Sequence, residues 1–221
     1  MNMSAMKAAG GVGMHSGPNL LPEGLAVAWT AVFLVVAASH LRHLAHTSGQ
    51  RRSWHACHVL MASGMVFMYA PAQIQALRVP GAFWQLIFAT TGLIAATWAI
   101  AGVGRVSTLI WLLTSIDLGV MLYMWSGTSR ANALPLACLL VAYLIAEGMM
   151  WALDLYRRLD GATPIVSWRV LATESGERVT APAIELAAPS GALLGELDIS
   201  ASMVAMTLGM AYMLVAMQIV V

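Results

Sequence analysis

The charged residues of this chain are separated by uncharged runs that are long enough to cross a membrane. The four longest runs hold 18, 25, 26 and 23 residues, and they lie between Glu23 and Arg42, between Arg52 and Arg78, between Arg78 and Arg105, and after Asp198. A helix needs about 20 predominantly apolar residues to span the hydrocarbon core of a bilayer. A transmembrane β-barrel would instead need short segments of alternating hydrophobicity, which these runs lack. The runs therefore predict transmembrane helices.

The composition supports an integral membrane protein in contact with the lipid bilayer. Hydrophobic residues make up 60% of the 221 residues and charged residues only 10%. Soluble domains average about 45–50% apolar and about 25% charged residues, so a water-soluble fold would leave much of this apolar surface exposed. The 11 basic and 10 acidic residues nearly balance, which gives no basic surface for nucleic acid. The composition thus excludes soluble enzymes and nucleic-acid-binding proteins.

Two more apolar runs of membrane length each contain one acidic residue, Asp117 in the first and Glu147 in the second. With them, the sequence predicts an all-α protein, a six-helix transmembrane bundle over residues 20–221. The six predicted spans are Leu21–His43, Trp54–Leu77, Ala82–Val103, Val106–Trp125, Ala133–Tyr156 and Ser200–Val221. Residues 1–19, which are rich in Met and Gly, are predicted to form a flexible tail, and residues 157–199 a loop of about 40 residues.

Arginine and lysine are unevenly shared between the two predicted sides of the membrane. One side carries eight of them, namely Arg42, Arg51, Arg52, Arg105, Arg157, Arg158, Arg169 and Arg178. The other side carries three, namely Lys7, Arg78 and Arg130. Loops rich in Lys and Arg stay in the cytoplasm. We therefore expect the loop 157–199 in the cytoplasm and both termini on the extracytoplasmic side.

Five of the six histidines fall within nineteen residues, and four of them are predicted to meet. His40 and His43 lie three residues apart near the end of the first span, so they share a helix face. His55 and His58 have the same spacing at the start of the second span. Because only a short loop, Thr47–Ser53, joins the two helices, we expect the four imidazoles to converge at the cytoplasmic boundary.

Methionines continue this pattern into the predicted membrane region. Met61, Met65 and Met68 follow His58 at offsets of 3, 7 and 10 residues, which places all four on one helical stripe. The last span repeats the pattern with Met203, Met206, Met210, Met213 and Met217. Thioether and imidazole donors together select a soft ion such as Cu(I). The predicted metal site comprises His40, His43, His55, His58, Met61, Met65 and Met68.

The main predicted function is therefore a non-enzymatic membrane protein that binds or passes Cu(I). Two alternatives stay open. A methionine stripe also packs well against a neighbouring helix, which would suit an accessory subunit of a larger membrane protein complex. Two facing histidines on adjacent helices can also ligate a b-type haem. The sequence contains no nucleophile elbow, no P-loop and no H-E-x-x-H motif, which favours a protein without enzymatic activity.

Asp117 and Glu147 are predicted at similar depth on two consecutive antiparallel helices. An ionised acid at that depth is costly, so each must be protonated, paired or hydrated. One interpretation is a site for a proton or another cation. The alternative is an interhelical hydrogen bond, with Thr114 or Ser115 as the partner.

The stretch Arg51–Pro71 resembles a family of uncharacterised multi-pass membrane proteins from actinobacteria. The resemblance rests on a histidine followed by methionines three, seven and ten residues later, then by an aromatic residue and a proline. In this chain the motif residues are His58, Met61, Met65, Met68, Tyr69 and Pro71. The resemblance covers about forty residues. It implies a bacterial plasma membrane location and no particular activity.

Overall fold

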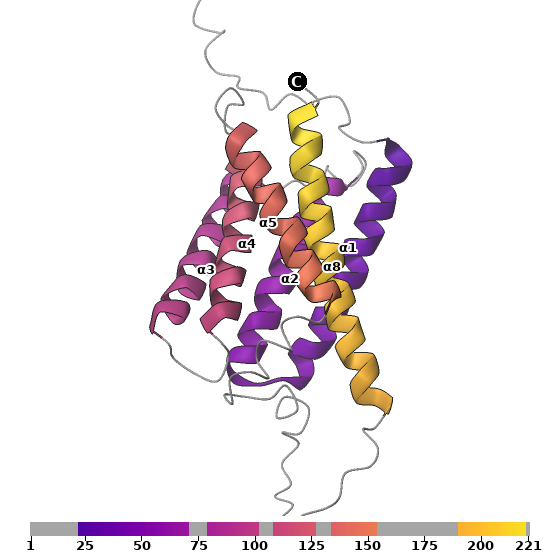
Figure 1. Ribbon diagram of the computed structural model, residues 1–221, viewed down its shortest axis with the longest axis vertical. Coiled ribbons are helices and arrows are strands. Elements are labelled where there is room, and N and C mark those ends of the chain that lie inside the picture. Colours follow the sequence, from indigo (N-terminus) through magenta and orange to yellow (C-terminus); the bar gives the residue numbers. More distant parts are fainter. Residues whose placement is uncertain (1–21, 71–78, 102–107, 127–133, 154–189, 220–221) are drawn as a thin grey trace, which may run out of the picture.

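The computed structural model describes residues 22–70, 79–101, 108–126, 134–153 and 190–219, and within the last range the side chains from 198 to 218. The regular elements in these ranges are six α-helices that lie side by side along one axis (Figure 1). Their bounds are Glu23–His46 for α1, Gly49–Tyr69 for α2, Gly81–Ala101 for α3, Thr108–Ser126 for α4, Leu134–Ala152 for α5 and Ser190–Ile219 for α8. The prediction of an all-α chain is confirmed. The predicted tail 1–19 lies outside the described residues.

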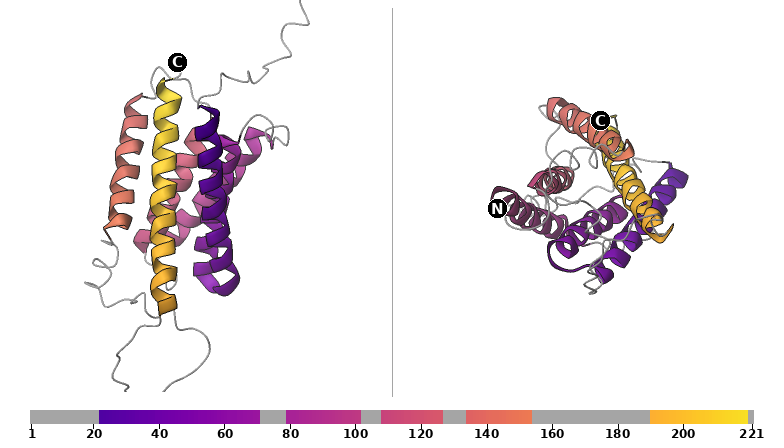
Figure 2. Two further views of the ribbon diagram at one scale, coloured as in Figure 1. Left: turned by 90° about the vertical axis from the view of Figure 1, so that its right-hand side faces the viewer. Right: turned by 60° about the horizontal axis from the view of Figure 1, so that its bottom comes forward.

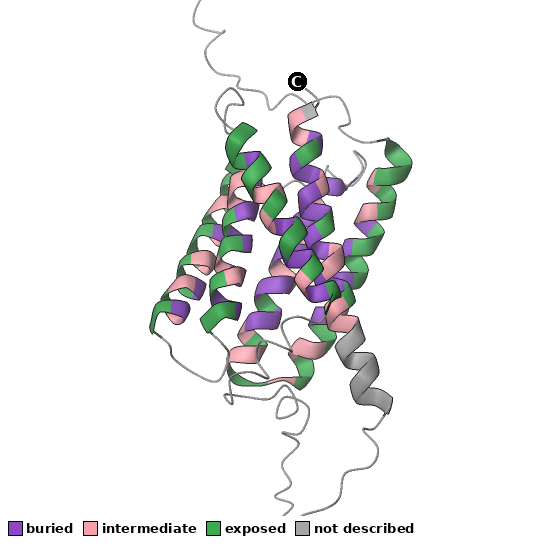
Figure 3. Cartoon of the chain, viewed as in Figure 1, coloured by how far each residue is buried: buried purple, intermediate pink, exposed green. Residues whose placement is uncertain are grey.

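Five segments are long and apolar enough to cross a membrane, and they lie in α1, α3, α4, α5 and α8. Their outward faces carry large apolar side chains, as expected for contact with lipid; among the most exposed are Val35, Leu86, Leu93, Ile100 and Leu139. Figure 3 shows exposed residues along the outer faces of the helices and buried residues toward the centre. The chain is therefore a helical, multi-pass membrane protein.

The second predicted span, Trp54–Leu77, differs from the other five. The helix α2 is not among the segments apolar enough to cross a membrane by composition. Nine of its residues are nevertheless buried, including the polar side chains of His55 and His58. It packs most closely against α1 and also contacts α4. Because its neighbours cover so much of its surface, α2 can carry polar groups that a lipid-facing helix cannot.

Two helix boundaries also differ from the sequence-based prediction. The loop between the first two helices was predicted as Thr47–Ser53, but α2 already begins at Gly49, whose positive φ of 64° permits the tight reversal. The last helix begins at Ser190, inside the segment predicted as a loop, and the residues from Ser190 to Asp198 include Ala192, Leu193, Leu194 and Leu197, which favour helix. The rest of the predicted loop, residues 157–189, lies outside the described residues.

The helices pack in three close pairs, α1 with α2, α3 with α4, and α5 with α8. The first and last pairs meet where α8 lies against α1, and Figure 2 shows α8 between α5 and α1. Two glycines allow close approach. A Cβ added at Gly64 of α2 would lie 2.6 Å from Cζ of Phe88, and one at Gly148 of α5 would lie 2.7 Å from Oγ1 of Thr207. These separations are far below van der Waals contact, so the packing depends on glycine there.

Candidate metal centre

The end of the bundle at which α1 and α2 join, called here the hairpin end, brings four histidines together. The ring centroids lie 5.3 Å apart for His40 and His55, 5.0 Å for His40 and His58, and 5.2 Å for His43 and His55. His40, His55 and His58 are buried, and His43 is half-buried at the edge of the group. The predicted convergence of four imidazoles is confirmed. His46 is exposed and lies outside the group.

A chain of hydrogen bonds joins three helices through His40. Its Nδ1 lies 3.0 Å from Nδ1 of His55, and its Nε2 lies 3.0 Å from Oγ of Ser202 on α8. The hydroxyl of Ser202 donates to the carbonyl oxygen of Ile199 at 2.7 Å, so His40 Nε2 must donate to Ser202. In a neutral imidazole the other nitrogen of His40 then accepts, and His55 Nδ1 donates to it. This assignment leaves a lone pair on His55 Nε2.

His58 has a second nitrogen lone pair in this cluster. Here one hydrogen bond is enough to show which ring nitrogen carries the proton. Its Nδ1 lies 2.8 Å from the carbonyl oxygen of Trp54, and a carbonyl can only accept, so Nδ1 carries the proton. The Nε2 atom therefore carries a lone pair when the ring is neutral. It is fully buried and has no hydrogen-bond partner among the described residues. A donor bond from one ring nitrogen to a backbone carbonyl is the usual arrangement of a histidine that binds a metal through the other nitrogen.

An ion pair between Arg42 of α1 and Asp198 of α8 connects the two helices at the hairpin end, beside the histidines. Asp198 accepts hydrogen bonds from Arg42 and, at 2.9 Å, from the hydroxyl of Ser39. Nε2 of His43 lies 3.5 Å from the same carboxylate oxygen. His43 thus lies beside this carboxylate, and its ring is half-buried at the edge of the cluster.

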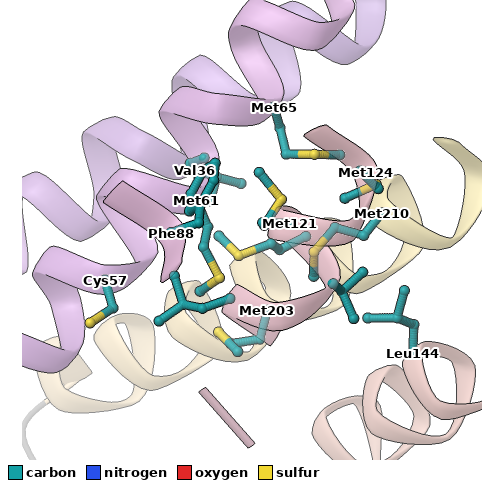
Figure 4. Close-up of a cluster of buried hydrophobic side chains, with 14 of the residues drawn as sticks. Val36, Cys57, Met61, Met65, Phe88, Met121, Met124, Leu144, Met203 and Met210 are labelled. Carbon is teal, nitrogen blue, oxygen red and sulfur yellow. The ribbon is translucent and has the colours of Figure 1, made fainter. Parts of the chain in front are cut away.

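The methionine stripe points into the core directly above His58. Met61 and Met65 are fully buried, whereas Met68 is half-buried. In Figure 4 the side chains of Met61, Met121, Met203 and Met210 gather between α2, α4 and α8. Of the five methionines predicted on α8, Met203, Met206, Met210 and Met213 are also buried, and Met217 is half-buried. Thioether sulfurs from three helices therefore line one region of the core.

Within the described ranges, no group of three or more His, Cys, Asp or Glu side chains is arranged to hold one metal ion. A metal centre built on nitrogen, oxygen and thiol donors alone thus has no support. A soft-metal site at the hairpin end would therefore need methionine sulfur beside a histidine nitrogen. Met61 lies one helical turn from His58 on the same face of α2, so the two can act together.

Several residues at this centre were not identified from the sequence. Ser202 and Asp198 lie at least 140 residues from the histidines in the chain, and Trp54 packs its ring 4.2 Å, centroid to centroid, from that of His58. One sequence signal does mark Asp198, since it is an acidic residue at the boundary of the last apolar run. Ser202 gave none, since its role depends on how α8 packs against α1.

The two intramembrane acids form a separate group between α4 and α5. The hydroxyl of Tyr143 donates to Oδ1 of Asp117 at 3.1 Å, and Asp117 and Glu147 interact directly. The prediction that both acids lie at similar depth is confirmed. The predicted partners were wrong. Thr114 donates to the carbonyl of Ile110 in its own helix, and Ser115 donates to Gly92 of α3.

Comparisons of this chain with protein-family models, with curated proteins and with solved structures found no match. The resemblance of the stretch Arg51–Pro71 to an actinobacterial membrane protein family therefore stays a prediction.

Proposed function

We propose that this chain is a membrane protein that binds Cu(I) at the hairpin end, with His58 Nε2 as its nitrogen ligand and Met61 as its first sulfur ligand. The observation that carries the proposal is the buried, unpartnered Nε2 of His58. A buried nitrogen acceptor without a donor is unfavourable in a folded protein, because it has lost its bond to water. A soft cation at this position would satisfy it.

The surroundings of His58 favour a copper ion over a hard metal. Buried methionines extend from Met61 through Met65 on α2, and Met203 and Met210 face them from α8. Thioethers bind Cu(I) well and hard divalent ions poorly. Methionine sulfur is uncharged, so it can hold an ion inside the membrane without adding a second charge.

The proposal includes α2 as a sixth membrane-crossing helix. This helix is polar only at the hairpin end and is covered by α1 and α4, so its polar groups need not meet lipid. The arginine bias of the loops supports an orientation with both termini on the extracytoplasmic side. The resemblance of Arg51–Pro71 to an actinobacterial family supports a bacterial plasma membrane as the location. The histidine cluster would then lie at the cytoplasmic boundary.

The packing supports the two alternative functions, a b-type haem protein and an accessory subunit of a membrane complex, less well than it supports copper binding. The rings of Trp54 and His40 lie 4.2 Å and 5.0 Å, centroid to centroid, from that of His58, and such close packing around one imidazole gives a porphyrin beside it little support. Most methionines of α2 and α8 are buried within the bundle, and only Met68 and Met217 are half-buried. The buried ones are not presented to a partner subunit, as the accessory-subunit hypothesis requires.

The test is copper retention by the purified protein in detergent under reducing conditions. We expect about one tightly bound Cu(I) per wild-type chain. The informative pair of variants is His58→Asn and His58→Gln. Asparagine can keep the bond to the Trp54 carbonyl through its side-chain amide but has no atom at the Nε2 position. Glutamine reaches that position but offers an amide instead of an imidazole. Both should reduce copper affinity at least tenfold.

Two further variants test whether Met61 binds copper or only packs in the core. Met61→Leu preserves volume and apolarity, and such exchanges usually cost less than about 1.5 kcal/mol in stability. Met149→Leu is the matched control, because Met149 is exposed on the outer face of α5. We expect Met61→Leu to lose copper and Met149→Leu to keep it. Wild-type protein that retains no copper, or equal retention by the two Met→Leu variants, would overturn the proposal.

A further inference from the structure

A second group of buried polar side chains lies halfway along the bundle, away from the histidines. Asp117 is the central residue of α4, with nine residues of the helix on either side of it. Tyr143 and Glu147 lie one turn apart on α5, and the Tyr143 hydroxyl donates to Asp117 at 3.1 Å. The exposed fractions of Asp117 and Glu147 are 1% and 3%. Both carboxyl groups are therefore shielded from water and from lipid headgroups.

The two carboxyl groups lie close enough to share a hydrogen bond, and they repel one another when both are charged. A hydrogen bond between two carboxyl groups needs a proton on one of them. In the described part of the chain, the arginine and lysine side chains are those of Arg42, Arg51 and Arg52, all at the hairpin end. No positive side chain there compensates two negative charges at this depth, so the pair must retain at least one proton.

One atom of the group has no partner. Oε2 of Glu147 is buried and makes no hydrogen bond with any described residue. A buried carboxyl oxygen without a hydrogen bond is unfavourable unless a proton, a cation or water satisfies it. The carboxyl pair carries one negative charge whenever the shared proton is the only one present. A positively charged group at this oxygen would satisfy both the atom and the charge of the pair.

The other described residues around Asp117 and Glu147 provide a hydroxyl oxygen but no positive charge that would compensate the carboxylates. On α3, residues 81–101 contain no titratable side chain. On α5, the next turn after Glu147 brings Trp151, which also interacts with the Glu147 carboxyl. On α8, the buried hydroxyl of Thr207 lies beside Gly148 and donates to the carbonyls of Met203 and Val204. The titratable groups facing one another are thus Asp117, Tyr143 and Glu147.

We propose that Asp117, Tyr143 and Glu147 form an intramembrane site for one monovalent cation, either a proton or an alkali ion in its place. The carboxyl pair with one shared proton has a single negative charge, which one monovalent cation neutralises. Carboxylate and phenol oxygens are hard donors, so the site differs in chemistry from the soft donors around His58. A calcium ion would need six to eight oxygen ligands, more than these three side chains supply.

A hydrophobic carbodiimide tests the site in the full-length protein, reconstituted in liposomes and freed of copper with a chelator. The reagent reacts with protonated carboxyl groups in apolar surroundings. The carboxyl proton moves to a nitrogen of the reagent while the carboxyl oxygen adds to its central carbon, and the adduct rearranges to a stable acylurea. Peptide mass spectrometry then identifies the modified residue. We expect Glu147 or Asp117 to be modified at least tenfold faster than Glu23, which is exposed at the start of α1.

Two changes of condition identify the occupant. Slower modification at alkaline pH, unaffected by alkali ions, identifies a proton. Slower modification on addition of sodium or lithium at constant pH identifies an alkali ion that competes with the proton. Modification that responds to neither condition means a permanently neutral hydrogen bond between the helices, and it overturns the proposal. So does the absence of modification at both acids.

The variant Glu147→Gln removes the charged acceptor while keeping its shape. Asp117 alone should then stay protonated, so its modification should continue but lose its response to alkaline pH and alkali ions. Glu23→Gln is the matched control and should behave as the wild type. If Glu147→Gln keeps the full wild-type response, the site does not include Glu147 and the proposal fails. The wild-type measurement alone decides the question if the variant does not fold.

Discussion

His40 and His55 join α1 to α2 through a hydrogen bond between their Nδ1 atoms, 3.0 Å apart. Two neutral imidazoles can form this bond only if one donates and the other accepts. The bond to Ser202 sets the donor and the acceptor, because it makes His40 a donor at Nε2 and an acceptor at Nδ1. A serine on α8 thereby determines the tautomer of a histidine on α2. The hairpin end is thus a single hydrogen-bonded unit built from three helices.

This unit predicts a coupling between His40 and His55 that a double-mutant cycle can measure. We expect His40→Ala and His55→Ala each to lower the free energy of unfolding in detergent, because each leaves a buried partner unsatisfied. The double variant should lose less than the sum of the two, by about 0.5–1.5 kcal/mol, the net contribution of one hydrogen bond. The exposed His46→Ala should change stability by less than about 0.5 kcal/mol. Strict additivity would show that the two rings do not share a bond.

The contact between α5 and α8 predicts a steric effect at Gly148. The variant Gly148→Ala would place its Cβ 2.7 Å from Oγ1 of Thr207, so the helices must separate or the hydroxyl must turn. We expect a loss of about 1–3 kcal/mol in the free energy of unfolding, as for other overpacked sites. Adding Thr207→Ala should restore part of the loss.

A matched glycine distinguishes this steric effect from helix propensity. Gly119 lies within α4 and has nothing within 4 Å of an added Cβ. Gly119→Ala should therefore leave stability unchanged or raise it by up to about 1 kcal/mol, because alanine favours helix more than glycine does. Equal effects of the two substitutions would mean that close packing at Gly148 is unimportant.

The sequence predicted those parts of the fold that depend on local pattern. Uncharged runs of membrane length predicted the helices, and the three-residue spacing of His40 and His43 predicted their shared face. The short connection after His46 predicted that the four imidazoles meet. Each of these inferences needs only the helix period and the thickness of a bilayer, so no knowledge of packing was required.

The parts that the sequence did not predict depend on contacts between distant segments. Ser202 sets the tautomer of His40 across 162 positions of sequence, and no local pattern marks it. Thr114 and Ser115 were the nearest polar residues to Asp117 in the chain, yet the partner is Tyr143 on another helix. A threonine or serine in a helix can satisfy its hydroxyl on its own backbone, and Thr114 does so. Sequence proximity was therefore a poor guide to hydrogen-bond partners.

Tyr69 lies at the end of the bundle opposite the hairpin end, and its contacts predict a measurable contribution to the free energy of unfolding. Its hydroxyl donates to the carbonyl oxygen of Gly209 on α8 at 2.7 Å, and its ring stacks on Phe33 of α1 with centroids 5.6 Å apart. Tyr69→Phe keeps the stacking and removes the hydrogen bond. We expect a loss of about 0.5–1.5 kcal/mol in the free energy of unfolding, with copper retention unchanged. Tyr123→Phe, whose hydroxyl makes no described hydrogen bond, serves as the control and should unfold as the wild type does.

The arginine bias of the loops predicts which end of the bundle faces the cytoplasm. Pro22 precedes α1 and Ser48 lies at the hairpin end, so the two positions lie at opposite ends of one membrane-crossing helix. In a chain with Cys57 and Cys138 replaced by alanine, a membrane-impermeant maleimide applied to intact bacterial cells should modify Pro22→Cys and spare Ser48→Cys. Permeabilised cells should show modification at both positions. The reverse pattern in intact cells would place the histidine cluster outside, where the proposed copper site would face the environment instead of the cytoplasm.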